Sequence, residues 1–356
     1  MKKKRLPFVS ICTPTFNRRP FIPYMLKCFE HQTYPKDKME WIIIDDGMDP
    51  IGDLVKHIPQ IKYFRYETKM TLGSKRNLAH AKSAGDILVY MDDDDYYPPE
   101  RVSHAVEMLQ QNPKALCAGS SEMHIYFKHI NQMYKFGPYG PNHATAATFA
   151  FRRELLKQTG YEETAAVAEE KHFLKGYTVP FVQLDTVKTI LVFSHEQNSF
   201  DKKSLLADAP NPYVMPSTKT VDDFIKNVEM KTFYMDNIDE TLKTYELGSM
   251  SYKPDVTNQL NDLRLKREKM IQEHQQKNEV LQRLQMQPDQ LIASYQSKIN
   301  EMNQIIQDLL RENAMLKETN QYLNTKMKEI ITDKIKSIQA NKESEYIIVS
   351  NETDIM

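Results

Sequence analysis

The chain has 356 residues and a formal net charge of −1, because 47 Lys and Arg nearly balance 48 Asp and Glu. This balance provides no overall attraction to nucleic acid or to an anionic membrane, so we expect neither as a partner. No apolar run reaches the ~20 residues of a transmembrane helix, and a strand-like run rather than a secretory signal follows the basic start. The three cysteines show no metal-ligand spacing and suit free thiols, so we expect a soluble, cytoplasmic protein.

Short apolar runs alternate with helical patterns over the first third of the chain. The runs at residues 8–13, 39–44, 61–67 and 86–91 predict strands, and the segments between them favour helices. Alternation of this kind predicts an α/β fold with a doubly wound, mostly parallel, Rossmann-like sheet. In such sheets, ligands bind beyond the carboxyl ends of the strands.

Polar clusters follow three of the predicted strands, at residues 13–17 (TPTFN), 45–47 (DDG) and 92–95 (DDDD). Four adjacent aspartates repel one another, and a solvated acidic turn is the usual explanation of an isolated run. Here, however, the three clusters would meet at one edge of a parallel sheet. That placement favours a bound cation, or a cation-bound phosphate, that offsets the repulsion.

Several stretches within residues 8–200 resemble family 2 inverting glycosyltransferases with the GT-A fold. They are VSICTPTFNRR, CFEHQTYPKDKMEWIIIDDG and LGSKRNLAHAKSAGDILVYMDDDDYYPPERV, with the shorter AEEKHFL and SHEQNSF. They are also similar to glycosyltransferases of large DNA viruses. The resemblance implies transfer of a sugar from a nucleotide-sugar, most simply a UDP-sugar, to a hydroxyl of a glycan, protein or lipid.

The family's D-x-D motif, which holds a divalent metal on the diphosphate of the donor, resembles Asp92-Asp93-Asp94 here. The resemblance makes Asp94 the direct metal ligand and places Asp92 near the ribose or the metal. Alternate residues of an extended segment point the same way, so Asp93 would turn aside within the nucleotide pocket. His195 would be a further ligand, although a lone histidine is as often structural. Oxygen ligands of this kind suit Mn²⁺ or Mg²⁺.

The resemblance also implies a nucleotide pocket at the first strand end and around the DDG motif. Its expected members are Thr13, Pro14, Thr15 and Asn17 at the base and ribose, Asp45 at the base, and Arg76 in GSKRN.

Inverting transfer needs a general base that takes the proton of the acceptor hydroxyl. Glu169 and Glu170 resemble the family's E-D pair, whose second acid is the base, with Glu in place of Asp. We therefore favour Glu170 over Glu169. The alternative is an ordinary acidic helix start.

Beyond about residue 256, Gln, Asn, Lys and Glu surround isolated Leu, Ile and Met. Counted from Ile292 in alternating steps of four and three, apolar side chains fill most seam positions as far as Ile330. Asn313 and Asn320 occupy first heptad positions, where Asn favours a two-stranded coiled coil. We therefore expect a homodimer through a coiled coil at residues 289–342.

The predicted organisation has four parts: a GT-A catalytic domain at 1–215, a helical linker at 216–288, the coiled coil at 289–342 and a loose tail at 343–356.

Two other functions remain open. Nucleotidyltransferases that make nucleotide-sugars share the wound sheet, but they carry a glycine-rich loop after the first strand, which TPTFNRR lacks. A coiled-coil scaffold with a degenerate transferase domain is disfavoured by carboxylates at each expected position. The sequence identifies neither the sugar nor the acceptor or linkage, nor whether the coiled coil recruits another protein.

Overall fold

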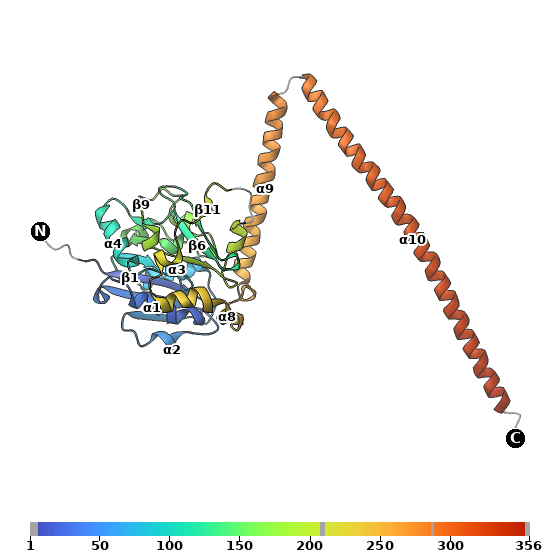
Figure 1. The fold of residues 1–356 in the computed structure, drawn as a ribbon, viewed down its shortest axis with the longest axis horizontal. Coiled ribbons are helices and arrows are strands. Elements are labelled where there is room, and N and C mark those ends of the chain that lie inside the picture. Colours follow the sequence, from blue (N-terminus) through green and yellow to red (C-terminus); the bar gives the residue numbers. More distant parts are fainter. Residues whose placement is uncertain (1–5, 207–210, 286–287, 353–356) are drawn as a thin grey trace. The chain divides into compact units, whose positions relative to one another are not determined.

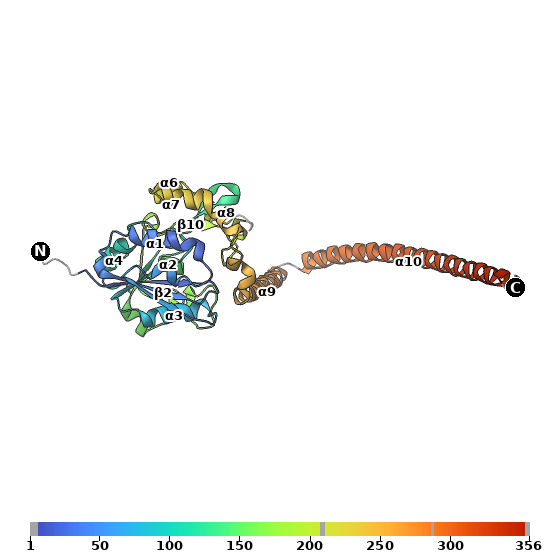
Figure 2. The same cartoon turned by 90° about the horizontal axis from the view of Figure 1, so that it is seen from below.

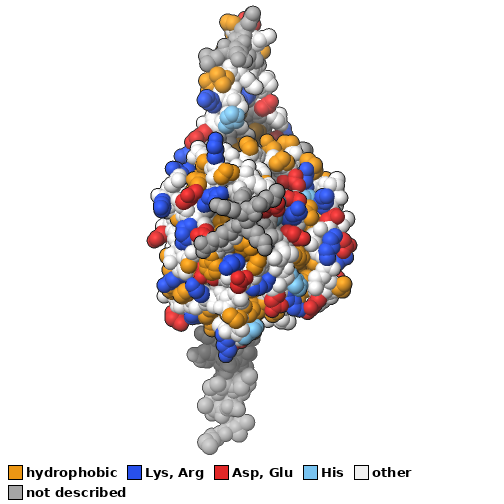
Figure 3. Space-filling view, turned by 90° about the vertical axis from the view of Figure 1, so that its left-hand side faces the viewer, with side chains coloured by type: hydrophobic (Ala, Val, Ile, Leu, Met, Phe, Trp, Pro, Cys, Tyr) orange, Lys and Arg blue, Asp and Glu red, His pale blue; other side chains and the backbone are white. Residues whose placement is uncertain are grey.

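The computed structural model describes residues 6–206, 211–285 and 288–352. The chain divides into a compact unit that ends at Lys266 and a helical unit that begins at Arg267. No helix in these described ranges combines the length and the apolar character needed to cross a bilayer. On the face of the molecule in Figure 3, Lys and Arg side chains are interspersed with Asp and Glu, in agreement with the small net charge.

A seven-stranded mixed sheet forms the centre of the compact unit (Figure 1). In spatial order its strands are β3 (Ile61–Arg65), β2 (Met39–Asp45), β1 (Val9–Thr15), β4 (Ile87–Tyr90), β8 (Ala150–Arg152), β5 (Cys117–Gly119) and β9 (Phe181–Gln183). The strands β3, β2, β1 and β4 are parallel, whereas β8 runs antiparallel to both of its neighbours. The α/β class and the strands at the predicted runs are confirmed.

Two apolar cores cover the two faces of this sheet, because successive side chains of a strand point to opposite faces. Ile11, Trp41 and Val89 lie in the larger core, with α1 (Ile22–Glu30), α2 (Gly52–Val55) and α4 (Arg101–Gln111). Cys12, Ile42 and Leu88 lie in the other core, with α3 (Leu72–Lys82) and α5 (Glu170–Phe173). Figure 2 shows α1 and α4 on one side of the sheet and α3 on the other.

A four-stranded sheet stands beside the central one, in the order β10 (Val192–Ser194), β6 (Met123–Phe127), β7 (Gln132–Phe136) and β11 (Val214–Pro216). Next along the chain come α6 (Val221–Phe224), α7 (Val228–Thr232) and α8 (Ile238–Lys243).

The compact unit is longer than the predicted catalytic domain, which was placed at 1–215. Phe224, Phe233, Tyr234 and Ile238 are buried in the larger core, and the ring of Phe233 stacks 3.4 Å from that of Tyr24. These helices therefore pack as part of the compact unit.

Two long helices end the chain, α9 (Pro254–Gln285) and α10 (Pro288–Glu352). The predicted break at Pro288 coincides with the start of α10. The tail at 343–356, which we expected to be loose, is helical as far as Glu352, because nothing in its sequence before that point breaks a helix; residues 353–356 lie outside the described ranges.

Candidate active site

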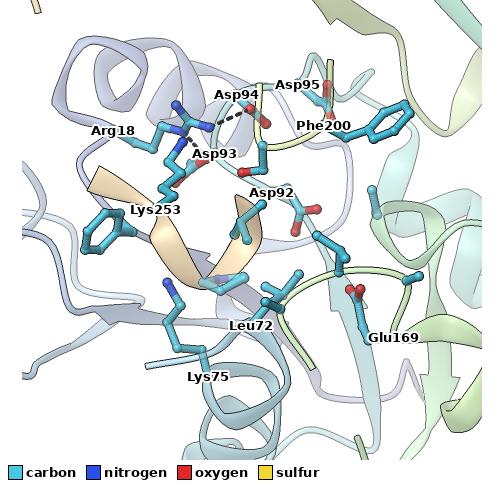
Figure 4. A pocket seen from close by; sticks show the side chains of 18 of the residues that line it. Arg18, Leu72, Lys75, Asp92, Asp93, Asp94, Asp95, Glu169, Phe200 and Lys253 are labelled. Atoms are coloured by element: carbon cyan, nitrogen blue, oxygen red, sulfur yellow. Dashed lines mark hydrogen bonds and ion pairs between the residues drawn. The ribbon is translucent and has the colours of Figure 1, made fainter. Parts of the chain in front are cut away.

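A cavity of about 350 Å³ lies at the carboxyl ends of β1 and β4. Its wall includes the end of β1, the acidic run, the loop before α5 and the first residues of α9 (Figure 4). The predicted residues that line it are Pro14, Asp92, Asp93, Asp94 and Glu169. This is the edge of the sheet at which the sequence predicted a site.

Arg18 offsets part of the repulsion within the acidic run. Its Nη2 lies 3.3 Å from Asp94 Oδ2, and its Nε lies 3.6 Å from Asp93 Oδ1. Burial raises the pKa of Asp93 to about 7 in spite of Arg18. Burial also acts to raise the pKa of Asp94, but Arg18 and His195 hold it well below its usual range. Asp94 is therefore a carboxylate that stays charged.

His195 lies behind the acidic run, with Nε2 3.5 Å from Asp94 Oδ2. The backbone N–H of His195 donates to Asn198 Oδ1 at 2.8 Å, and the Asn198 amide lies 2.8 Å from Nε2. Burial lowers the pKa of His195 to about 4, so its imidazole is neutral, as a metal ligand must be. Its Nδ1 is buried without a hydrogen-bond partner.

The donor chemistry of these residues fits a divalent cation. Asp92 and Asp94 supply hard oxygen ligands and His195 a neutral nitrogen. Within the described ranges, no group of three or more His, Cys, Asp or Glu side chains is already arranged around a cation position. The remaining coordination positions of such a cation would be open to a bound diphosphate and to water.

Arg76 joins the acidic run to the glutamate pair. Its Nε donates to Glu169 Oε1 at 3.0 Å, and its two terminal nitrogens lie 3.4 Å from the oxygens of Asp92. The guanidinium also lies 4.4 Å from the centre of the Tyr90 ring. The Arg76 and Glu169 side chains are 2% and 6% exposed, so their ion pair is shielded from water, whereas the Asp92 side chain is 23% exposed to the cavity.

The start of α3 brings Arg76 to this position. Thr71 caps the helix by accepting from the Ser74 N–H at 3.3 Å. Gly73 packs so closely on the loop before α5 that a Cβ atom there would lie 2.0 Å from the Glu162 carbonyl oxygen. The start of α3 therefore lies directly against the loop that leads to Glu169.

The two glutamates differ in environment. Glu169 lines the cavity and is held by Arg76. Glu170 begins α5 beside it and is not a lining residue. Burial, together with the charge of Glu169, raises the pKa of Glu170 to about 6. Ala168, directly before the pair, has a left-handed φ of 55°, an uncommon conformation for a residue with a side chain.

Three residues that we expect to contact the nucleotide make hydrogen bonds within the protein at the strand ends. Thr13 Oγ1 donates to the Met91 carbonyl at 2.5 Å and accepts from Trp41 Nε1 at 2.9 Å. Asn17 accepts from the Met48 N–H at 2.6 Å. Asp45 accepts three hydrogen bonds, from the backbone of Gly47 and Ile51 and from the Tyr63 hydroxyl. Thr15 is buried at the end of β1 and, like Arg76, does not line the cavity.

Four cavity-lining cations were not singled out from the sequence: Arg18, Lys69, Lys202 and Lys253. Arg18 could have been found, because it directly follows the polar end of the first strand. Lys202 and Lys253 stand in stretches with no motif of their own. Lys75, which precedes Arg76, also lines the cavity and donates to Asp46 Oδ1 at 2.9 Å.

Residues 10–161 match the model of the family described as glycosyl transferase family 2. An uncharacterized glycosyltransferase of Haemophilus influenzae is 30% identical over 106 residues, which are 30% of this chain and 35% of the relative. A second such protein of that organism is 21% identical over 225 residues, 58% of this chain and 84% of the relative. The chain thus spans about a third of the length of the first relative.

Similar solved structures are more distant. The crystal structure of Staphylococcus aureus TarS 1-349 in complex with UDP is 19% identical and covers 53% of this chain and 61% of that one, with a TM-score of 0.41. The structure of mannosyltransferase PcManGT of Pyrobaculum calidifontis, in complex with GDP-Man and Mn²⁺, is 15% identical in sequence. The match covers 74% of this chain and 81% of that one, with a TM-score of 0.44.

Proposed function

We propose that the chain, whose residues 10–161 match the model of glycosyl transferase family 2, is a metal-dependent, inverting hexosyltransferase. It transfers a sugar from a UDP-sugar to a hydroxyl of a glycan, protein or lipid. One observation carries the proposal: Asp92, Asp94 and Glu169 line one cavity at the carboxyl ends of parallel strands. Such a transfer needs carboxylates for a cation and a carboxylate for acid–base chemistry at one place, and Glu170, the proposed base, directly follows the lining residue Glu169.

The diphosphate end of the donor lies beside the acidic run in this proposal. Asp92 and Asp94, with His195 behind them, would hold Mn²⁺ or Mg²⁺, which when bound supplies Lewis-acid stabilisation of the diphosphate. Arg18 keeps Asp94 ionised, and Arg76 forms an ion pair with Asp92. Pro14 and Phe16, at the end of β1, line the side of the cavity assigned to the nucleoside.

Glu170 is the proposed general base. The acceptor oxygen attacks the anomeric carbon, its proton passes to the Glu170 carboxylate, and the electrons of the breaking C–O bond leave on the diphosphate. The Glu169 carboxylate is already bound to the Arg76 guanidinium, with Oε1 and Nε 3.0 Å apart. Glu170, with its pKa raised to about 6, is the better proton acceptor. Glu169 then acts as a positioning residue.

A screen of nucleotide-sugars tests this function. The protein is incubated with UDP- and GDP-sugars, with Mn²⁺ or with a chelator, and release of the nucleoside diphosphate is measured. We expect release from a UDP-sugar that the chelator abolishes. Binding of UDP without turnover across the panel would instead favour the scaffold with a degenerate transferase domain, and synthesis of a nucleotide-sugar from a sugar phosphate would favour the nucleotidyltransferase.

We also propose that α10 pairs with a second copy of the chain. The seam side chains are open to solvent in the single chain; Ile292 and Ile330, near the two ends of the pattern, are each 66% exposed. The seam extends over about 60 Å of helix at ~1.5 Å per residue, and a parallel partner helix with the same pattern would cover it.

A further inference from the structure

The first turns of α9 close one side of the cavity. Lys253, Asp255 and Val256 are lining residues, although they follow the family-matched region by about 90 residues of sequence. Figure 4 shows this segment passing across the pocket, with Lys253 beside Arg18 and Asp93. The compact unit includes this segment, since it extends to Lys266.

Contacts with two other walls hold the segment in place. Asp255 pairs with Lys69, which lies in the loop before α3. Gln259 Oε1 accepts from the backbone N–H groups of Ala166 at 2.7 Å and Val167 at 2.9 Å. The start of α9 is therefore tied both to the nucleotide side of the cavity and to the loop that carries the glutamate pair.

Lys253 is 3% exposed, and its Nζ donates to the Gln197 carbonyl oxygen at 3.2 Å. An ammonium group has three N–H donors, so this bond leaves two for other acceptors. Arg18 donates to the same carbonyl at 2.9 Å and also makes the ion pairs with Asp93 and Asp94. The nearby carboxylates are thus already paired with Arg18.

The other lysines of the cavity have different surroundings. Lys75 is paired with Asp46, and Lys69 with Asp255. Lys202 is only partly buried. Among the lining cations in the described ranges, Lys253 combines full burial with a carbonyl oxygen as its hydrogen-bond acceptor and no ion pair. A buried cation is stable only when an anion compensates it, and the open side of Lys253 faces the cavity.

We propose that Lys253 binds the diphosphate of the donor, so that the start of α9 is part of the donor site. This inference rests on the proposed function. A lysine ammonium binds phosphate as a point charge, and Lys253 would hold the diphosphate from the wall that the start of α9 contributes to the cavity. The donor site then draws on residues far beyond the family-matched region.

Binding of nucleotides measured by calorimetry tests this inference. Lys253→Gln removes the charge but keeps an N–H donor for the Gln197 carbonyl, and Lys253→Met removes both. Lys266→Gln, on the exposed part of α9, is the matched control. With Mn²⁺ present, we expect both Lys253 variants to bind UDP about tenfold or more weakly than wild type, because a hydrogen bond to a charged group is lost. UMP binding should change by less, and the control should bind as wild type.

Two results separate the inference from the function on which it rests. If the wild-type protein binds neither UDP nor GDP, both the proposed function and the role of Lys253 are wrong. If it binds UDP and the Lys253 variants bind equally well, or if UMP binding weakens as much as UDP binding, the inference alone is overturned. Thermal unfolding of each variant establishes that it is folded. If the Lys253→Met variant does not fold, the binding test uses the Lys253→Gln variant.

Discussion

Arg76 Nε and Glu169 Oε1 lie 3.0 Å apart in the buried interior of the site, and the same guanidinium reaches Asp92 at 3.4 Å. The Arg76 guanidinium therefore links Asp92, which is assigned to the metal, to Glu169, which lies beside the proposed base. Any change in Arg76 alters the charge on both sides.

Replacement of Arg76 is expected to destabilise the protein strongly. Arg76→Ala leaves two carboxylates without their partner, and removal of one member of a buried ion pair costs on the order of 3 kcal/mol in the free energy of unfolding. Arg76→Lys should lose less stability but still reduce turnover, because an ammonium group lacks the planar set of N–H donors with which a guanidinium binds two carboxylates at once. Urea unfolding without ligand measures the first effect. The exposed Arg311→Ala is the control, and an equal loss there would contradict the assignment.

Removal of Asp94 should abolish metal-dependent chemistry. Asp94→Ala is expected to lower turnover by about a hundredfold or more, because a metal contributes several kcal/mol to the stability of the leaving diphosphate. It should also abolish the stabilisation that Mn²⁺ and UDP together give in thermal unfolding. Asp37→Ala, which changes an exposed carboxylate, is the control. Full activity in Asp94→Ala would show that the donor is bound without this ligand.

The rate should depend on pH through Glu170. The base works only when deprotonated, and burial places its pKa at about 6. Turnover is therefore expected to be level above this pH and to fall about tenfold for each pH unit below it. A pH profile of kcat/KM measures the effect. A rate that stays constant down to pH 5, about one unit below this pKa, would rule out Glu170 as the base.

Glu170→Gln separates catalysis from stability. We expect turnover to fall by about a hundredfold or more while UDP binding is unchanged. The folded protein raises the pKa of Glu170 from 4.5 to about 6, so the stability that the protonated form contributes below pH 4.5 is lost as the pH rises through 6. A permanently neutral Gln should then stabilise the protein at pH 7.5 by up to about 2 kcal/mol.

The matched comparison is Glu169→Gln, which breaks the ion pair with Arg76 and should destabilise the protein instead. Urea unfolding of both variants at pH 5 and pH 7.5 provides the test. If Glu169→Gln loses turnover and Glu170→Gln retains it, the roles of the two residues are reversed.

The central sheet was predictable because local patterns determine it. The apolar runs that became β1, β2 and β4 end in the polar clusters, and the parallel order follows from strand–helix alternation. The extent of the domain was not predictable in this way. The short helices α6 to α8 carry no clear period, and the partner of Phe233 is Tyr24, more than 200 residues earlier.

The residues of the candidate site were likewise predictable only where they stand in a local sequence motif. Asp92, Asp94 and Glu169 stand in motifs, and the structure brings them to one cavity. Asp45 also stands in a motif, but its three hydrogen bonds are made to nearby backbone and to Tyr63, which only the folded loop places around it. Lys253 has no local signal, because its position depends on how the start of α9 packs against the acidic run.

The proposed pairing of α10 leads to a test in solution. Leu309 and Leu316 occupy seam positions and are 58% and 57% exposed in the single chain. Changing both to Lys places like charges opposite each other in a parallel pair and removes their apolar contact, so the protein should become monomeric. Light scattering during size-exclusion chromatography measures the mass, with Gln304→Lys, on the outer face of the same helix, as the control. A wild-type mass of one chain would overturn the pairing, and an unchanged mass in the double variant would exclude this seam.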